Sequence, residues 1–587
     1  MKKNIIIAII ISATGLSASA QTDTTINKNV VVVREYNPTI SDANKINLIP
    51  EIQKPEIKTP TFSYSFFTHP LETSFEIIPL TPATLSSEPR RDYDQNYISL
   101  GGGNYSSLFG ELFYNAFHSD KHSLSFFANN RSSFGKVKME DGSKNDATFV
   151  KNNLLLAYKH QFWGTYLTAN LGFSNHNYRY FGYQTIKPDS VSYMALNDTN
   201  NVVLNQADIT YPNQKPGYAS FKANFVFATN PSIYDETAYK AELYYDHFFT
   251  RMDFKEDLIG LKGFFEKPVG DNLAGGALDV QYGMYNVPDT ALYKDFNNFT
   301  YIDFSPYFKL NRNTWNLKLG LNAFFNIQKD KTDYLVTPDI DFNFNLIEKL
   351  FTAHLMAGGN YRLNDYRNSI QINPYMTPEL NVMPTQIPLS LEAGLTGQLT
   401  PKIVFNGSVN FSIVKNNPFY INEFYITDTS QVSSVAYSNQ FTAVYDDMNV
   451  LTVKAAIDYA GNDRYSFGAS GAYYNYALDN LEYAWHLPDY EIKVYGSFVP
   501  YRNVTVNVDF TTISKREALT QDAIGSGVTE RTQLKAVYDL SLSGEYQYNN
   551  RLSASLNLNN ILSSNYYYWN GYPSFGFNVL AGVKYRF

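Results

Sequence analysis

The sequence predicts an all-β fold: a transmembrane antiparallel β-barrel of about 22 strands, preceded by a Pro-rich N-terminal segment. Apolar and polar residues alternate with a period of two in many segments, and short and long breaks alternate between these segments. Aromatic residues make up 16% of the chain, while charged residues make up 17%, below the roughly 25% of ordinary soluble domains. A wall with one face in lipid and the other in water has this pattern and this composition.

Residues 1–20 have the features of a secretory signal peptide. Lys2 and Lys3 precede an apolar stretch, and the small residues Ala18, Ser19 and Ala20 follow it, so we expect cleavage after Ala20. The apolar run is shorter than the ~20 residues that a membrane-spanning helix needs. Together with the predicted barrel, the leader predicts export to the outer membrane of a Gram-negative envelope.

Residues 21–92 differ in composition from the rest of the chain. They show little alternation and contain eight prolines, at positions 38, 50, 55, 60, 70, 79, 82 and 89, which favours an extended segment over regular sheet. Their apolar side chains, however, would be poorly hidden in a free linker. This set comprises Phe62, Tyr64, Phe66, Phe67, Phe75, Ile77 and Ile78. We therefore expect a periplasmic or lumen-filling segment that packs on the inner wall or the periplasmic mouth of the barrel and limits its conductance.

The alternation is regular in residues 93–587, which we assign to the barrel. In the stretch 504–510, valines and a phenylalanine alternate with Thr505, Asn507 and Asp509. Residues 552–559 and 403–412 repeat the pattern, with Ser and Asn on the polar side. Such polar sets are suited to a wet lumen, and the apolar sets to lipid.

The breaks between strands are of two kinds. Tight turns are expected near 118–121, 311–314, 461–464 and 548–551, and long connections near 178–215, 363–388, 415–440 and 513–533. This alternation is typical of periplasmic turns and extracellular loops. An even strand number then leaves both termini on the periplasmic side.

The last strand runs to the final residue of the sequence. Apolar residues occupy every second position up to Phe587, and Lys584 and Arg586 stand between them. A strand without a tail needs a partner for its edge, so we expect this strand to pair with the first one and close the barrel.

Several patterns that suggest other functions are better explained by the barrel. The net charge of −8 gives no reason to expect a nucleic-acid partner, and the absence of Cys excludes thiolate sites. His118, Asp120 and His122 are expected to be solvated residues of a tight turn. The glycines of 101–104 and 468–471 have no following helix, so we attribute them to barrel bends or close packing rather than to phosphate binding. No grouping of nucleophile, base and carboxylate is apparent, and we predict neither an enzyme nor a cofactor or metal site.

The C-terminal residues resemble the end of a TonB-dependent receptor barrel. The resemblance is carried by Asn560, by Gly571, Tyr572 and Pro573, by Gly576, and by a last strand that ends in Tyr-x-Phe. A barrel of about 22 strands is also the size found in that family. The resemblance implies that Val579, Ala581, Val583, Tyr585 and Phe587 form the signal that the barrel-assembly machinery reads.

The N-terminal part departs from that family. Only about 70 residues separate the expected cleavage site from the first strand, and the chain contains no Arg-Gly dipeptide, so the usual plug domain is not expected. Val30, Val31, Val32 and Val33 resemble a TonB box, which adds as a strand to the TonB protein. An anchoring strand for the N-terminal segment is an equal alternative.

Three functions follow from these observations. The first is a TonB-dependent-receptor-like barrel that acts in uptake or as a subunit of an outer-membrane complex. The alternatives are a passive porin-like channel and a structural scaffold barrel with a closed lumen. Expected partners are outer-membrane lipid and the barrel-assembly machinery, with TonB and a surface or periplasmic lipoprotein as further candidates. What fills a lumen of this width would distinguish these hypotheses. The candidates are residues 21–92, inward-folded loops such as 366–380, and a partner.

Overall fold

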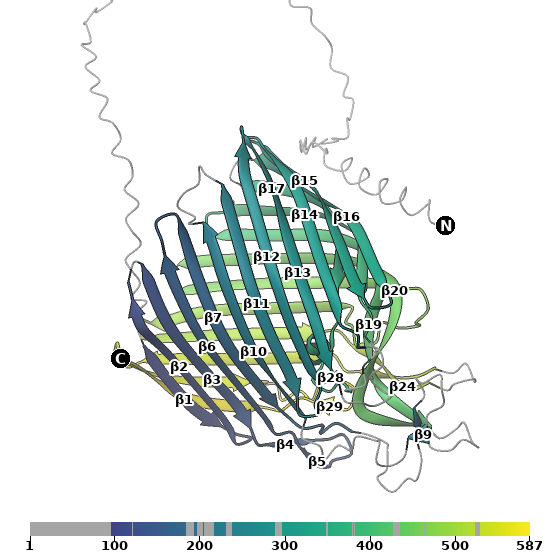
Figure 1. Ribbon diagram of the computed structural model, residues 1–587. Coiled ribbons are helices and arrows are strands. Elements are labelled where there is room, and N and C mark those ends of the chain that lie inside the picture. Colours follow the sequence, from purple (N-terminus) through teal and green to yellow (C-terminus); the bar gives the residue numbers. More distant parts are fainter. Residues whose placement is uncertain are drawn as a thin grey trace, which may run out of the picture. The chain divides into compact units, whose positions relative to one another are not determined.

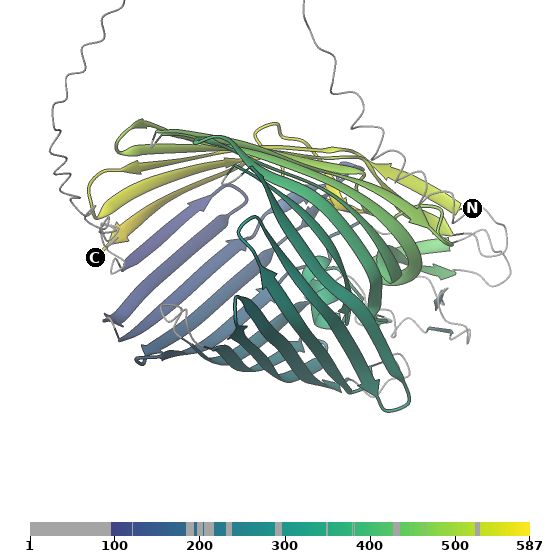
Figure 2. The ribbon, with the colours of Figure 1, turned by 90° about the horizontal axis from the view of Figure 1, so that it is seen from above.

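In the computed structural model, one antiparallel sheet closes on itself as a barrel (Figures 1 and 2). The structure describes residues 96–587 except 120, 184–192, 196–202, 205–215, 230–236, 288–295, 348–349, 378–379, 381, 427–434, 463 and 523–528. Within these residues, 22 strands of the sheet form the ring, and the short strands β8 (Tyr193–Ala195) and β9 (Val203–Leu204) extend from β19. The predicted strand number is confirmed.

The first half of the ring consists of β1 (Tyr97–Gly103), β2 (Ser107–His118), β3 (His122–Ser133), β6 (Phe149–Gln161), β7 (Thr165–Asn177), β10 (Gly217–Thr229), β11 (Ala238–Thr250), β12 (Lys255–Val269), β13 (Asn272–Asn286), β14 (Phe299–Asn311) and β15 (Trp315–Gln328). The second half consists of β16 (Thr332–Ile347), β17 (Phe351–Arg362), β18 (Thr385–Thr400), β19 (Ile403–Ile426), β20 (Val435–Asn462), β21 (Tyr465–Leu478), β22 (Tyr490–Tyr501), β23 (Val504–Ile513), β26 (Val537–Gln547), β27 (Leu552–Asn559) and β30 (Asn578–Arg586). Three hairpins lie outside the ring: β4 (Lys136–Lys138) with β5 (Lys144–Asp146), β24 (Arg516–Asp522) with β25 (Thr529–Leu534), and β28 (Tyr567–Trp569) with β29 (Tyr572–Pro573).

The first and last strands close the ring, as the sequence predicts. Tyr97 lies opposite Arg586 and Gly103 opposite Leu580, and the Phe587 amide donates to the Asn96 carbonyl over 2.9 Å. At this seam Gly101 lies opposite Gly582, and a Cβ on either residue would overlap the ring of Phe109. Glycine therefore allows an aromatic ring from β2 to lie across the closing pair, which is the close packing expected for the glycines of 101–104.

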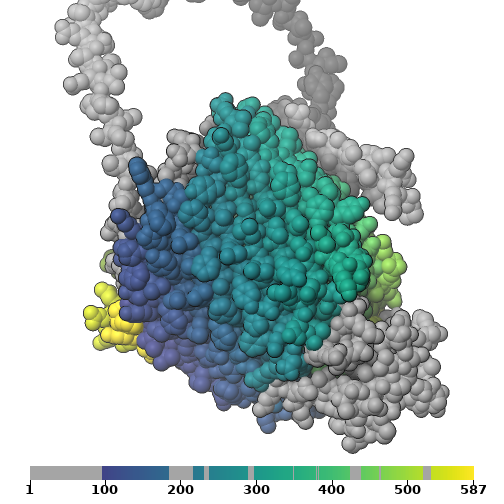
Figure 3. All heavy atoms as spheres, viewed as in Figure 1, coloured from purple at the N-terminus to yellow at the C-terminus, as the bar shows by residue number. Residues whose placement is uncertain are grey.

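The two faces of the wall have different surfaces, which follows from the period of two. Leu243, Leu261 and Phe304 are 49%, 49% and 48% exposed and face outward. Figure 3 shows one outer face, where side chains of successive strands form a continuous surface. On the lumen side, polar groups bond to one another; the Ser412 hydroxyl, for example, lies 2.9 Å from the Ser390 hydroxyl. The predicted alternation of lipid-facing and lumen-facing residues is confirmed.

The two ends of the barrel carry different connections. The turn end bears the tight connections, such as 312–314 and 548–551, together with Tyr97 and Arg586. The loop end bears the three hairpins and the one α-helix of the described residues, α2 (Tyr366–Ile372), which lies inside the ring of strands (Figure 2). No helix within the described residues is both long and hydrophobic enough to span a bilayer.

One expected connection is wrong. Instead of a long loop over 415–440, β19 continues to Ile426 and β20 starts at Val435, and the two strands pair along this extension. The sequence lacks alternation here because both faces of the extension are covered. Phe419 and Ile421 pack with Trp485 on one face, while Tyr420 joins the cluster of α2 on the other.

Candidate functional site at the loop end

A buried cluster inside the loop end draws together residues from distant strands. We call this cluster and the connections that supply it the loop cap. Its connections are 363–384 between β17 and β18, which includes α2, and 560–577 between β27 and β30, which includes β28 and β29. Its buried apolar members are Phe248, Phe254, Phe296, Tyr366, Ile370, Met376, Leu380, Tyr420, Phe441, Ala443 and Tyr572. Since these residues come from strands and connections around the ring, the cap crosses the lumen instead of lining one wall.

The helix α2 begins at a polar N-cap. The Asp365 carboxylate accepts from the Asn368 amide over 2.7 Å, which satisfies one of the free N–H groups of the first turn. Tyr366 in this turn packs against Phe254, with ring centroids 4.6 Å apart. The helix was not expected from the sequence, because seven residues are too few to give a helical period.

An ion cluster fixes α2 to the opposite wall. Arg367 donates to Asp246 of β11 over 2.7 Å and to Asp365 over 3.1 Å, and its guanidinium lies 3.6 Å from Glu256 of β12. All four side chains are 11% exposed or less. Burial alone would lower the pKa of Arg367, but the three carboxylates outweigh this effect and raise it. The contact is therefore a buried, charge-assisted anchor for the cap.

An aromatic stack joins the two connections of the cap. The rings of Tyr375 and Tyr572 lie 3.5 Å apart at an angle of 14°, and the Tyr572 hydroxyl donates to the Asn439 carbonyl over 2.6 Å. The backbone next to this stack pairs with β20: the Thr377 amide donates to the Phe441 carbonyl over 2.7 Å, and the Phe441 amide donates to the Tyr375 carbonyl over 2.9 Å. The expected loop 366–380 thus packs across the barrel mouth.

The residues that carry the family resemblance lie in the second connection of the cap. Asn560 organises its start, because its side-chain amide donates to the carbonyls of Ser564 and Phe575, 3.0 Å in each case. Gly571 has φ +83°, a left-handed conformation that favours glycine, and places Tyr572 in the buried cluster. Pro573 is in β29, and Gly576 lies near the hydroxyl of Tyr105. What role these residues have in function stays a prediction.

The C-terminal strand shows an apolar outer face. Val583, Tyr585 and Phe587 are 51%, 43% and 54% exposed, and Val579 and Ala581 stand on the same face of β30. This exposure is compatible with the predicted signal for the barrel-assembly machinery, which stays a prediction.

Other sequence candidates are not brought into this site. His118 ends β2 and His122 begins β3 at the turn end, and Asp120 lies outside the described residues. Among the described residues, no three His, Cys, Asp or Glu side chains are grouped in a way that could hold a metal ion. The residues 468–471 lie within β21. The possible TonB box at Val30–Val33, the signal peptide and the segment 21–92 lie outside the described residues.

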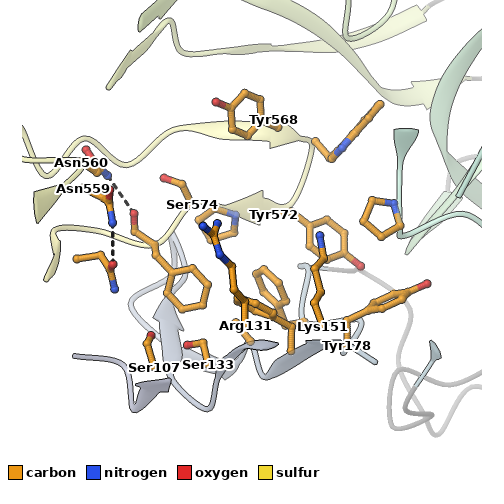
Figure 4. Close-up of a pocket in the computed structure, with 18 of the residues that line it drawn as sticks. Ser107, Arg131, Ser133, Lys151, Tyr178, Asn559, Asn560, Tyr568, Tyr572 and Ser574 are labelled. Carbon is orange, nitrogen blue, oxygen red and sulfur yellow. Dashed lines mark hydrogen bonds between the residues drawn. The ribbon is translucent and has the colours of Figure 1, made fainter. Parts of the chain in front are cut away.

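A cavity of about 1090 Å³ lies beneath the cap (Figure 4). Its wall comes from strands on both sides of the seam, and Tyr375, Trp569 and Tyr572 of the cap line it as well. Arg131 and Lys151 point into it side by side, toward the cap residues Ser574 and Tyr572. The sequence alone did not predict a role for these two residues or for Arg367. Each is an isolated charge in the sequence, and only strand register and loop packing bring it next to its neighbours.

Comparisons with known proteins identify the fold. No family model and no curated protein matches the chain. Among solved structures, the siderophore receptor PirA from Acinetobacter baumannii is similar with a TM-score of 0.61 at 11% identity, covering 84% of this chain and 80% of that one. The copper transporter OprC is similar with a TM-score of 0.59 at 13% identity, with coverages of 84% and 80%. The ferric-catecholate import receptor Fiu from K12 E. coli, in its closed form, gives a TM-score of 0.58 at 10% identity, with coverages of 84% and 82%.

These identities are low, so the likeness concerns the fold. Each neighbour shares a barrel over most of its own length with this chain, in agreement with the ring of 22 described strands and with the resemblance at the C-terminus. The chain therefore has the β-barrel fold of the TonB-dependent outer-membrane receptors.

Proposed function

We propose that this protein is an outer-membrane uptake receptor whose passage is closed at rest by its own loop cap. The observation that carries the proposal is the cap itself, in which Arg367 and Tyr572 tie two long connections to strands around the ring. A passive channel of this strand number would need an open lumen, whereas 22-stranded transporters are normally plugged. The structural neighbours include a copper transporter and a ferric-catecholate import receptor, which supports uptake over catalysis.

The location and the coupling follow from the same proposal. The apolar outer wall supports a location in the outer membrane, and in this proposal the turn end and both termini face the periplasm. Residues 1–20 act as the signal peptide, and residues 21–92 precede the barrel of residues 93–587. Val30–Val33 would be offered to TonB, so that energy from the inner membrane can open the passage.

Antibiotic exclusion in cells tests the closed state. Cells that carry the intact protein should stay resistant to a bulky hydrophilic antibiotic, and a variant with Arg367→Gln and Tyr572→Ala should become sensitive at equal surface abundance. The matched control is the double variant Lys240→Gln and Tyr334→Ala, which changes two exposed residues. Cells that carry it should stay resistant. Sensitivity of cells with the intact protein would instead establish the passive channel.

Coupling of this protein to TonB needs a separate test, in a strain that is shown to require the protein. Replacing Val30–Val33 with polar residues should abolish its phenotype while leaving its surface abundance unchanged. An unaltered phenotype would favour the scaffold or passive-channel alternatives over TonB coupling.

A further inference from the structure

The cavity beneath the cap has one strongly basic wall. Register places Arg131 of β3 opposite Lys151 of β6, and Lys151 opposite His176 of β7. All three side chains line the cavity. Two neighbouring strands thus present cations side by side on the lumen face, and the third strand adds an imidazole to the same row.

Among the residues that the structure describes, the two cations of this row have no acidic partner. Within the described residues, neither Arg131 nor Lys151 has a carboxylate within 4.0 Å. The nearby Glu111 lies opposite Asn129 and accepts from the Tyr97 hydroxyl instead. Several other cations of the wall are paired with a carboxylate; Lys309, for example, donates to Glu266 over 2.6 Å. Like charges directly opposite each other on neighbouring strands destabilise a sheet, so the Arg131–Lys151 pair costs stability unless an anion joins it.

The surroundings are suited to a ligand that carries an anion. Figure 4 shows Arg131 and Lys151 pointing together toward the β28–β29 hairpin, near Ser574. A guanidinium offers a planar fork of donors that matches a carboxylate or phosphate, and the ammonium beside it adds a point charge. The aromatic side chains of Tyr178 and Trp569 line the same cavity, and so offer contact area to the rest of a ligand.

From this geometry we propose that Arg131 and Lys151 form a binding site for an oxyanion, a phosphate or carboxylate group of a ligand held beneath the loop cap. The proposal names the class of ligand that the receptor proposed above would take up. The biological role of the site rests on that proposed function, but binding of the anion does not. Binding itself is a property of the purified barrel and can be measured whether or not the passage is closed.

Isothermal titration of the purified full chain in detergent tests the site, with inorganic phosphate and with succinate as separate probes and chloride at equal ionic strength as the reference. The wild type should bind at least one of the two oxyanions. Arg131→Gln and Lys151→Gln should each weaken binding about 10-fold or more, since a hydrogen bond to a charged group is lost. Lys309→Gln, which removes a paired lumen cation, is the matched control and should leave the affinity unchanged.

A stability measurement keeps the test decisive if a variant folds poorly. Without added oxyanion, Lys151→Gln should raise the temperature at which the folded band disappears on gels, because the repulsion is relieved. When phosphate or succinate is added, the wild type should gain heat resistance, whereas the variants should not. Binding of phosphate only would identify a phosphate-bearing ligand, and binding of succinate only a carboxylate-bearing one. Absence of binding and of stabilisation by both probes would overturn the proposal, as would affinity that is unchanged in both variants.

Discussion

Replacing Arg367 should loosen the loop cap while leaving the barrel intact. The substitution Arg367→Gln leaves Asp246, Glu256 and Asp365 buried without their shared cation. Breaking a buried ion pair by removing one partner typically costs ~3–5 kcal/mol. The remaining bonds of Asp246, to Lys222 at 3.1 Å and to Ser220 at 2.6 Å, compensate in part, so we expect the lower end of this range.

A loss of ~3 kcal/mol should increase the ratio of open to closed cap about 100-fold, because every 1.4 kcal/mol is a factor of ten. The chain contains no Cys, so a single cysteine can report this opening. Ser369 in α2 is 3% exposed, and Ser369→Cys is nearly isosteric. Its labelling by a bulky maleimide in liposomes should accelerate about 100-fold when Arg367→Gln is added.

The control variant replaces another cation, one of β11 whose ion pair is exposed to solvent. Lys240 of β11 lies 2.9 Å from Glu242 and its side chain is 46% exposed, so Lys240→Gln should change labelling by less than about fivefold. Equal labelling rates in the Arg367 and Lys240 variants would refute the anchoring role of the ion cluster.

Three further predictions concern the seam, the cap and the C-terminus. Gly582→Ala should lower the folded fraction, because a Cβ there would overlap the Phe109 ring, whereas Gly544→Ala meets no atom within 4 Å and should be neutral; equal folded fractions on gels would contradict this packing argument. Burial lowers the pKa of His486, whose Nε2 accepts from the Asn570 amide, to about 3. The open cap therefore binds a proton that the closed cap rejects, so closure should be fully stable above about pH 6.5 and weaken as the pH falls toward 3. Cysteine labelling, taken relative to an exposed cysteine at the same pH, should rise over this range; labelling that stays flat, or that rises equally in His486→Asn, would argue against the role of His486. Phe587→Ala, or deletion of residues 585–587, should reduce outer-membrane abundance more than an equal change in a long loop, as measured by surface labelling; unchanged abundance would remove the assembly role.

The barrel could be predicted because its signals are local. The period of two and the pairing demand of the last strand are each visible within about 15 residues, and the structure confirms both. Prediction was wrong at 415–440, where the cap covers one face of the β19–β20 extension and Trp485 packs on the other, so that the alternation is lost.

The cap and the basic row could not be predicted because their contacts are long-range. Arg367 meets Asp246 across 121 residues, and which residues of a loop face a distant wall is decided by tertiary packing. The juxtaposition of Arg131 and Lys151 depends on strand register, and a slip of one residue would place them on opposite faces. The aromatic content of the loops did signal that they bury surface, but not against which partner.

Single-channel recording in planar bilayers tests the central claim, that the loop cap closes the lumen. Four forms of the protein should be compared: the intact chain, a variant lacking residues 22–90, the cap variant with Arg367→Gln and Tyr572→Ala, and the combination. We expect low conductance from the intact chain, and only a partial increase on removal of residues 22–90, because the cap stays closed. The account predicts that the combination conducts well above the variant lacking residues 22–90 alone, whereas equal conductance of these two forms would contradict closure by the cap.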